Sequence, residues 1–348
     1  MSELRQDPTT REWVIVAPER AKRPQQRPRK ERTDELQNWD ESCPFCPGNE
    51  TETPDEVFRI PIASETSGWA VRVVPNRFAA LTSNGNMTRS TDGPFFRKRA
   101  GIGVHEVIIE SPSHNIPLAL MPYQQVENVV IAYQERYNAL KKNHQLKFIT
   151  IFKNHKWASG TSLAHPHSQL VATPIPATYY HLKSDVAADY CYDFGSCLYC
   201  DLLTEELQKG ERIVAETKEL IVLNPYASRV PYETWIIPKR HYASFGLFPA
   251  EHLAELAMVI KDTLFCLYHG LDNPAFNLMI DTATTDNEMN PCYHWHIKII
   301  PRLTLIAGFE MGSGIYITTA LPEETARSMK KVANSFTEGE CPSFTQKS

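Results

Sequence analysis

The segment His165-Pro166-His167-Ser168-Gln169 places two imidazoles and a carboxamide on alternate residues. In an extended segment, side chains two residues apart point to the same face, so we expect all three groups to share one face. A neutral imidazole can attack phosphorus, an amide can donate to a phosphoryl oxygen, and a second imidazole can bind a metal ion. Histidines at this spacing also occur on ordinary solvated strands, so the neighbouring segments decide between the two interpretations.

The flanking segments favour a reactive site. Phe152-Lys153-Asn154 leads to the small-residue loop Ala158-Ser159-Gly160-Thr161-Ser162, which would let the backbone approach a ligand closely. The apolar run Leu170-Val171-Ala172-Thr173-Pro174 follows and predicts a strand. The chain has neither the G-x-x-x-x-G-K-[ST] phosphate loop nor a G-x-G-x-x-G after a strand, which argues against kinase and dinucleotide-binding folds.

The eight cysteines are unevenly placed. Two pairs have the spacing C-x-x-C, and the other four stand alone at Cys191, Cys266, Cys292 and Cys341. In a reducing compartment, paired C-x-x-C motifs indicate metal ligands before disulfides, although a thioredoxin-like redox pair is the alternative for each. Structural zinc takes four cysteine or histidine ligands in a tetrahedron. We predict two zinc sites, with the ligands Cys43, Cys46, His114 and His165 in one and Cys197, Cys200, His241 and His294 in the other. A single site shared by the four paired cysteines is the competing arrangement.

If His165 binds the metal, His167 is the free imidazole and the predicted nucleophile. Its attacking nitrogen must be neutral, and its other nitrogen should donate to a carbonyl that fixes the tautomer. Attack on a phosphoanhydride would give a phosphoramidate, and Gln169 would donate to the phosphoryl oxygens. We interpret the remaining histidines as ordinary surface residues: His105, His144, His155 (near the small-residue loop), His181, His252 and His269.

Residues 43–174 and 197–301 repeat the same signals in the same order. Each has a C-x-x-C pair, two apolar strands, a helix, a further strand, and an H-x-H that precedes a proline. The expected strands are 71–76, 105–110 and 146–152 in the first copy and 220–225, 233–238 and 276–281 in the second. The helices are indicated by Val126, Val129, Val130, Tyr133, Tyr137 and Leu140, and by Leu253, Leu256, Ile260, Leu264 and Leu267. This order predicts an α+β protein made of tandem duplicated β-sheet-plus-helix units.

The two copies differ in their polar residues. The second reads His294-Trp295-His296-Ile297-Lys298, with lysine in place of Gln169, and it has no small-residue loop. We therefore expect the first copy to be catalytic and the second to be structural. The insertion from Thr82 to Ile102 is expected to be a surface loop. The predicted organisation is an N-terminal arm (1–40), a catalytic unit (41–180), a second unit (190–335) and a frayed tail (336–348).

The bulk properties exclude several classes. The chain has 348 residues, of which 42% are hydrophobic and 22% charged, as expected of a globular protein. No apolar run approaches the length of a membrane span, and the N-terminus lacks the apolar stretch of a secretory signal, so a cytoplasmic location is expected. The net charge of -5 opposes broad binding to nucleic-acid phosphates. It therefore opposes, together with the wide separation of the two C-x-x-C pairs, the alternative of a zinc-dependent nucleic-acid-binding module.

The motifs resemble a known family. The duplicated H-x-H-x-Q unit resembles the histidine-triad superfamily, and residues 5–335 resemble the galactose-1-phosphate uridylyltransferase family. The resemblance rests on the segment from Arg11 to Pro24, on Cys43-Pro44-Phe45-Cys46-Pro47-Gly48-Asn49, and on the H-x-H-x-Q motif. It implies that His167 takes the nucleotidyl group with Gln169 as its partner. It also implies nucleotide contacts from Asn76, Asn154, Gly160 and Ser162, phosphate or sugar contacts from Arg20 and Arg23 across a homodimer interface, and hexose contacts from Phe309 and Glu310.

The basic, proline-broken arm at residues 1–40 has two interpretations, a solvated arm or one that lays cations over a phosphate site. The resemblance implies a ping-pong transfer between UDP-glucose and galactose 1-phosphate in galactose metabolism. Two features differ from the best-known family members: Ser168 replaces glycine or cysteine, and residues 309–317 lack the usual hexose-contact glutamine. Residues 309–317 are more similar to a branch that includes a plant adenylyltransferase, so an ADP-glucose phosphorylase is the alternative activity. The presence of Cys197 and Cys200 also implies a second zinc ion, where some family members instead hold iron through a glutamate and histidines. A histidine-triad hydrolase fits less well because the resemblance spans most of the chain.

Overall fold

The computed structural model describes residues 2–22, 36–62, 68–83, 85 and 88–336. Arg23, Cys341 and the predicted tail from 337 onward lie outside the described residues. The main feature is a ten-stranded sheet in which every neighbouring pair is antiparallel. The strands follow in the order β10 (Ile213–Glu216), β11 (Leu220–Leu223), β12 (Thr234–Pro238), β14 (His296–Pro301), β13 (Phe276–Asp281), β8 (Phe148–His155), β9 (His167–Thr173), β7 (Val104–Ile109), β4 (Trp69–Pro75) and β3 (Phe58–Pro61).

The strand order confirms the predicted duplication. From one edge inward the strands are β3, β4, β7, β9 and β8, and from the other edge they are β10, β11, β12, β14 and β13. Each half therefore has the same topology, and the halves join where β8 pairs with β13. One continuous sheet results, so the boundaries proposed for two separate domains stay a prediction.

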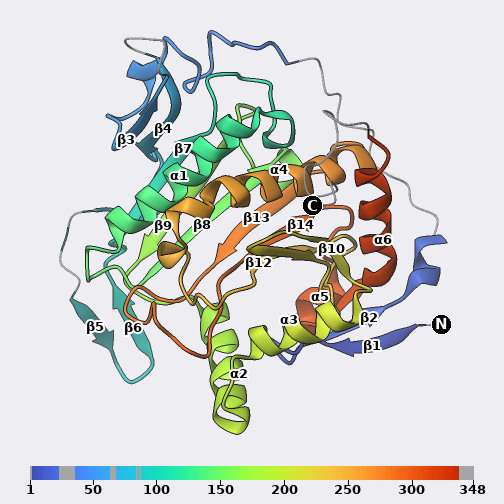
Figure 1. The fold of residues 1–348 in the computed structure, drawn as a ribbon. Helices are drawn as coiled ribbons and strands as arrows, with labels where there is room; N and C mark the ends of the chain where they lie inside the picture. Colours follow the sequence, from blue (N-terminus) through green and yellow to red (C-terminus); the bar gives the residue numbers. More distant parts are fainter. Residues whose placement is uncertain (1, 23–35, 63–67, 84, 86–87, 337–348) are drawn as a thin grey trace.

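The helix of each unit covers the same face of the sheet. α1 (Tyr123–Leu140) and α4 (Leu253–Gly270) pack side by side across the junction of the two halves, with α6 (Pro322–Ala333) against α4 (Figure 1). The apolar positions that predicted these helices are buried in the main core, because residues at helical spacing form one stripe toward the sheet.

The opposite face is covered differently in the two halves. In the second half, α2 (Thr178–Phe194) and α3 (Leu198–Lys209) pack over β11 and β12 and form a second core. In the first half, the segment around the first C-x-x-C packs on β4 and β7 in a smaller cluster. This difference leaves part of the first unit's face uncovered by a helix.

The remaining elements lie around the sheet. A three-stranded sheet joins β1 (Glu3–Gln6), β2 (Trp13–Val16) and β15 (Tyr316–Thr318), and α5 (Gly308–Ser313) packs against β15. The described part of the insertion forms an exposed hairpin of β5 (Arg89–Asp92) and β6 (Phe96–Arg99), where a surface loop was expected. The short 3-10 helices are Pro18–Lys22, Glu50–Glu52, Leu118–Leu120, Trp157–Ser159, Phe245–Leu247 and Ala250–His252. Within the described residues, no helix is both long and apolar enough to cross a membrane.

Candidate functional site

The predicted ligands of the first metal site lie together. Cys43, Cys46, His114 and His165 are all buried, and their ligand atoms lie within 4.8 Å of one another. His165 Nδ1 is 3.7 Å from Cys43 Sγ and 3.6 Å from Cys46 Sγ, and His114 Nδ1 is 3.4 Å from Cys46 Sγ. His165 Nε2 donates to the carbonyl of Ser111 at 2.8 Å, so Nδ1 carries the lone pair that faces the sulfurs.

The second set of predicted ligands has the same arrangement. Cys197, Cys200, His241 and His294 also lie within 4.8 Å of one another. Cys200 Sγ is 3.5 Å from Nδ1 of both histidines. Two separate clusters oppose the alternative of one site shared by four cysteines.

Both clusters fit a tetrahedral metal ion. Zn–S bonds of about 2.3 Å and Zn–N bonds of about 2.0–2.1 Å, at tetrahedral angles, place sulfur and nitrogen about 3.6 Å apart. The observed separations of 3.4 to 3.7 Å agree with this value. The two-cysteine, two-histidine donor set with no carboxylate is the set that structural zinc prefers.

His167 begins strand β9, directly beside the first cluster. Its Nδ1 lies 2.8 Å from the carbonyl oxygen of His165 and must donate to it, because a carbonyl only accepts. In a neutral ring Nε2 then carries the free lone pair. Burial lowers the pKa of His167 below its usual value, and the charge of Lys153 acts in the same direction. The ring of His167 packs against that of Phe45 in an edge-to-face arrangement, with the ring centroids 5.4 Å apart. His167 is therefore held neutral with Nε2 available as a nucleophile.

Gln169 lies on the same strand face as His167, two residues further along β9. Its Oε1 contacts Nε2 of His105 at 2.8 Å and Nδ2 of Asn76 at 3.5 Å. The interpretation of His105 as a surface residue is wrong, because β7 pairs with β9 and carries His105 to Gln169 across the sheet. Asn76, a predicted nucleotide contact, thus lies next to Gln169.

Asn154 and the small-residue loop lie at the end of β8. Extending the β8–β9 register by two residues places Asn154 opposite His167. The loop turns at Gly160, whose φ of +96° is in the left-handed region that favours glycine. A Cβ at Gly160 would lie 3.8 Å from Asn154 Nδ2, so the loop backbone comes close to this amide. Gly160 and Ser162 are exposed and Asn154 is half-buried, as expected of groups that line an open site.

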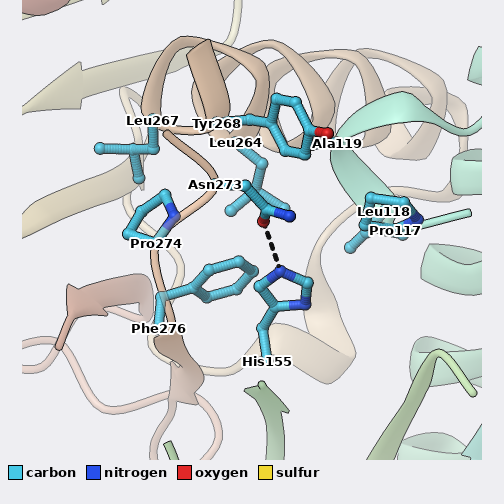
Figure 2. Close-up of a pocket in the computed structure, with 10 residues that line it drawn as sticks. All are labelled: Pro117, Leu118, Ala119, His155, Leu264, Leu267, Tyr268, Asn273, Pro274 and Phe276. Atoms are coloured by element: carbon cyan, nitrogen blue, oxygen red, sulfur yellow. Dashed lines mark hydrogen bonds between the residues drawn. The ribbon is translucent and has the colours of Figure 1, made fainter. Parts of the chain in front are cut away.

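The loop is anchored through His155, which is also not an ordinary surface residue. Its Nε2–H donates to Asn273 Oδ1 at 2.8 Å and its ring packs on Phe276 at 4.9 Å (Figure 2). Burial lowers the pKa of His155 to about 4, so the ring is neutral near pH 7. The small, mostly apolar cavity beside it, lined also by Leu264 and Leu267, has a volume of about 10 Å³. Room for about one water excludes it as a nucleotide pocket.

A buried polar cluster lies behind His167, on the face covered by α1. Lys153 Nζ donates to Glu110 Oε2 at 2.6 Å and to the carbonyl of His167 at 3.2 Å. The hydroxyl of Ser168 donates to Glu110 Oε1, and Tyr133 bonds to both Ser168 and Glu110. Ser168 lies between His167 and Gln169 in the sequence. Its side chain therefore points to the opposite face of β9, where it bonds to Glu110 and Tyr133.

The second unit has the same framework with different chemistry. Asp281 pairs with His296 across β13 and β14, which is the position that Asn154 occupies in the first unit. His296 Nδ1 donates to the carbonyl of His294 at 3.1 Å, as His167 does to His165.

A lysine from α2 occupies the place in the second unit that corresponds to the candidate active site of the first. Lys183 is fully buried, forms an ion pair with Asp281, and its Nζ lies 3.4 Å from His296 Nε2. Lys298 Nζ, in place of the first unit's glutamine, lies 3.9 Å from Asp281. The nitrogen that would attack, His296 Nε2, therefore faces the buried Nζ of Lys183, which supports a structural role for this copy.

Three predicted contacts, Arg20, Phe309 and Glu310, are not joined to His167 within the described part of the chain. Arg20 is exposed on the 3-10 helix Pro18–Lys22, and Arg23 lies outside the described residues. Phe309 and Glu310 lie on α5, and Glu310 Oε2 accepts from the backbone N–H of Ala307. In the described ranges, no hydrogen bond or ion pair connects the side chains of Arg20, Phe309 and Glu310 to the site, so their predicted roles stay untested, as does that of Arg23.

Cys191 and Cys292, which lie outside the two C-x-x-C motifs, form a disulfide that the sequence did not predict. Helix α2 runs beside the loop that leads to His294, and this brings the two Cα atoms to 5.6 Å, within the usual range for a disulfide. The bond ties α2 to the second metal cluster.

Comparisons with known proteins agree with this geometry. Residues 1–175 match the family described as galactose-1-phosphate uridyl transferase, N-terminal domain. An ADP-glucose phosphorylase of Arabidopsis thaliana is 34% identical over 95% of this chain and 93% of its own length. A galactose-1-phosphate uridylyltransferase of Thermotoga maritima is 30% identical over 95% of this chain and 98% of its own length.

Solved structures share the fold. The crystal structure of the Arabidopsis thaliana ADP-glucose phosphorylase with bound ADP-glucose has a TM-score of 0.81 at 31% identity and covers 95% of this chain and 98% of its own. A uridylyltransferase structure with a TM-score of 0.73, at 24% identity, supports the fold alone. Since the matches span both units of the sheet and the H-x-H-x-Q strand, this chain belongs to the galactose-1-phosphate uridylyltransferase family of nucleotidyltransferases.

Proposed function

We propose that this chain transfers a nucleotidyl group from a nucleoside diphosphate sugar through a covalent intermediate on His167. The observation that carries the proposal is the hydrogen bond from His167 Nδ1 to the carbonyl of His165, which leaves the lone pair on Nε2. Nε2 attacks the α-phosphorus, the bond from phosphorus to the bridging oxygen breaks, and the sugar leaves as its 1-phosphate. An oxygen of the acceptor phosphate then attacks the same phosphorus and the bond to Nε2 breaks.

The surrounding residues have defined tasks in this scheme. Positive charge develops on the imidazole as Nε2 bonds to phosphorus, and the carbonyl of His165 stabilises it through Nδ1–H. Gln169 and Asn154 donate to the phosphoryl oxygens, while the backbone at Gly160 and Ser162 lies close to the phosphates. Asn76 supports Gln169 and contacts the nucleotide. A nucleic-acid-binding role has no support from the site or from the family.

We further propose that both metal clusters hold zinc with a structural role. Each has four protein ligands, which leaves no open position for substrate. The first ion would hold His165, whose carbonyl orients His167, so the metal and the nucleophile are mechanically linked.

Metal analysis of the purified protein should therefore give about two zinc equivalents per chain, from the count of two four-ligand clusters. Cys43→Ser should lower the content by about one and lower the thermal unfolding temperature, because metal binding stabilises the folded state. Cys266→Ser, at a buried cysteine outside both clusters, is the control for cysteine removal. A wild-type content near one would leave one cluster without a metal.

For the donor we propose ADP-glucose with inorganic phosphate as acceptor, and UDP-glucose with galactose 1-phosphate as the second candidate. The relative called an ADP-glucose phosphorylase is 34% identical, against 30% for the uridylyltransferase, and its crystal structure contains ADP-glucose. Residues 309–317, which depart from the hexose-contact segment of the best-known uridylyltransferases, are similar to the branch that includes a plant adenylyltransferase. The homodimer, in which Arg20 and Arg23 would contact phosphate or sugar across the interface, stays a prediction, and so do the hexose contacts of Phe309 and Glu310.

The test is a panel of ADP-, UDP- and GDP-sugars labelled in the nucleotide. The reactive donor should release sugar 1-phosphate and leave labelled protein, because the first product departs before the acceptor binds. Initial rates at several fixed acceptor concentrations should give parallel double-reciprocal lines. Intersecting lines with no labelled protein for any donor would exclude the covalent route.

A further inference from the structure

Two carboxamides of the proposed site, Gln169 and Asn154, are proposed to donate to the phosphoryl oxygens, and the direction in which each amide points decides whether it stabilises the transfer. A primary amide can present either its oxygen or its amino group. A phosphoryl oxygen only accepts, so each amide must present its amino group to stabilise phosphoryl transfer. The direction of each amide therefore depends on which protein group donates a hydrogen bond to its oxygen.

The oxygen of Gln169 is held by His105. The backbone N–H of Ala80 donates to His105 Nδ1 at 3.2 Å, so that nitrogen is the acceptor of the ring. In the neutral imidazole the hydrogen is then on Nε2, which donates to Gln169 Oε1 at 2.8 Å.

Asn76 acts in the same direction. Its Oδ1 accepts from the backbone N–H of Phe78 at 2.8 Å, which turns its amino group toward both His105 and Gln169. Asn76 Nδ2 lies 3.1 Å from His105 Nε2 and 3.5 Å from Gln169 Oε1, and because His105 Nε2 carries the ring hydrogen, the acceptor of the Asn76 amino group is the oxygen of Gln169. The oxygen of Gln169 thus receives donors from two sides. Among the residues described, the structure gives its amino group no protein partner.

The oxygen of Asn154 is held from the second unit. Arg302 Nε donates to Asn277 Oδ1 at 2.5 Å, and because a guanidinium cannot accept, the orientation of Asn277 is determined. Asn277 Nδ2 then donates to Asn154 Oδ1 at 2.7 Å and to the carbonyl of Ser159 at 2.9 Å. Asn277 lies directly opposite Asn154 where β13 pairs with β8.

We infer that His105 and Asn277 are positioning residues that hold both amides with their amino groups toward the transferred phosphoryl group. The inference deepens the proposed function and rests on it. The second unit would then contribute to the reaction. Its strand β13 pairs with β8 of the first unit, and Asn277 on β13 orients the amide of Asn154 on β8. The donors are in place before substrate binds, which is the condition under which they lower a transition-state barrier most.

The test for His105 is a double-mutant cycle with Gln169. The quantity measured is the single-turnover rate of nucleotidyl-protein formation at a saturating concentration of the donor. Removing one such donor typically costs about 10²- to 10³-fold, so we expect Gln169→Ala to lie in this range and His105→Leu to lose about tenfold or more. His105→Gln, whose amide can again donate, should regain most of the rate. In the Gln169→Ala background, His105→Leu should cause no further loss. His144→Leu, at an exposed histidine, is the matched control.

The test for Asn277 uses the isosteric change Asn277→Asp. The new carboxylate accepts where the amide donated, so Asn154 should turn its oxygen toward the phosphoryl group and the rate should fall by about 10²-fold. In the Asn154→Ala background the same change should have little effect. An equal loss in both backgrounds would mean that the new charge or a distortion is responsible, and would overturn the inference for Asn277.

Two failures are distinguishable. If the wild-type protein forms no nucleotidyl-histidine with any donor, the proposed function is wrong. If the wild type is labelled but the losses from His105→Leu and Gln169→Ala multiply, only the positioning role of His105 is wrong. Circular dichroism and thermal unfolding of each variant separate both results from loss of the fold.

Discussion

His167→Ala should reduce nucleotidyl transfer by about 10⁶-fold, the size of loss that follows removal of a covalent nucleophile. The reason is that no other group replaces Nε2, since Gln169 cannot form the intermediate and His165 is turned toward the cysteines. The fold and the zinc content should not change, because the ring of His167 is not a metal ligand and makes one side-chain hydrogen bond, to the carbonyl of His165. The measurements are the initial rate, covalent labelling with the nucleotide, and metal analysis.

His296→Ala is the matched control because His296 has the same place in the second unit. Burial lowers its pKa well below the usual value, and Lys183 faces its Nε2 at 3.4 Å. It should keep its rate per folded molecule, although removal of a fully buried ring should reduce stability. Full activity in His167→Ala together with an inactive, folded His296→Ala would reverse the assignment of the two units.

The sequence predicted those parts of the site that are encoded by residues close together in the chain. The strand that carries His167 and Gln169 was predicted from the apolar run that follows them. The ligand sets were predicted from the C-x-x-C pairs, the H-x-H motifs and the histidines that follow a central strand in each unit. The amphipathic helices were predicted for the same reason, because a helix that packs on a sheet buries one stripe of its surface. The duplication was visible because both units repeat these signals in the same order.

The rest depends on pairing between distant segments. His105 reaches Gln169 because β7 pairs with β9 in one register, and a shift by one residue would turn His105 to the other face. Asn277 contacts Asn154 because β13 and β8 join the two units, a pairing between residues more than one hundred apart. Lys183 reaches His296 because α2 folds back over the sheet of the second unit. The helical pattern of α2 alone does not reveal this packing. Propensity and spacing contain no information on such contacts.

Lys153→Met should destabilise the protein by about 3–5 kcal/mol, because removal of one partner leaves the other charge buried and unpaired. Glu110 is fully buried and accepts from Lys153 at 2.6 Å, so without the ammonium it must either remain charged in the core or become protonated. Urea or thermal unfolding measures the loss. Lys209→Met, at the exposed pair with Glu205, is the control and should have little effect, because that pair is screened by water.

The double variant Lys153→Met with Glu110→Leu should recover much of this stability. With both charges gone, the hydroxyls of Tyr133 and Ser168 can still bond to each other, since their oxygens are 2.5 Å apart. The recovered protein should nevertheless transfer more slowly than the wild type, because Lys153 Nζ also donates to the carbonyl of His167 and helps to hold the nucleophile's backbone. A double variant as unstable as Lys153→Met alone would show that the charge of Glu110 is not the cause. Full activity in a stable double variant would mean that the Lys153–Glu110 pair stabilises the sheet behind His167 and has no role in catalysis.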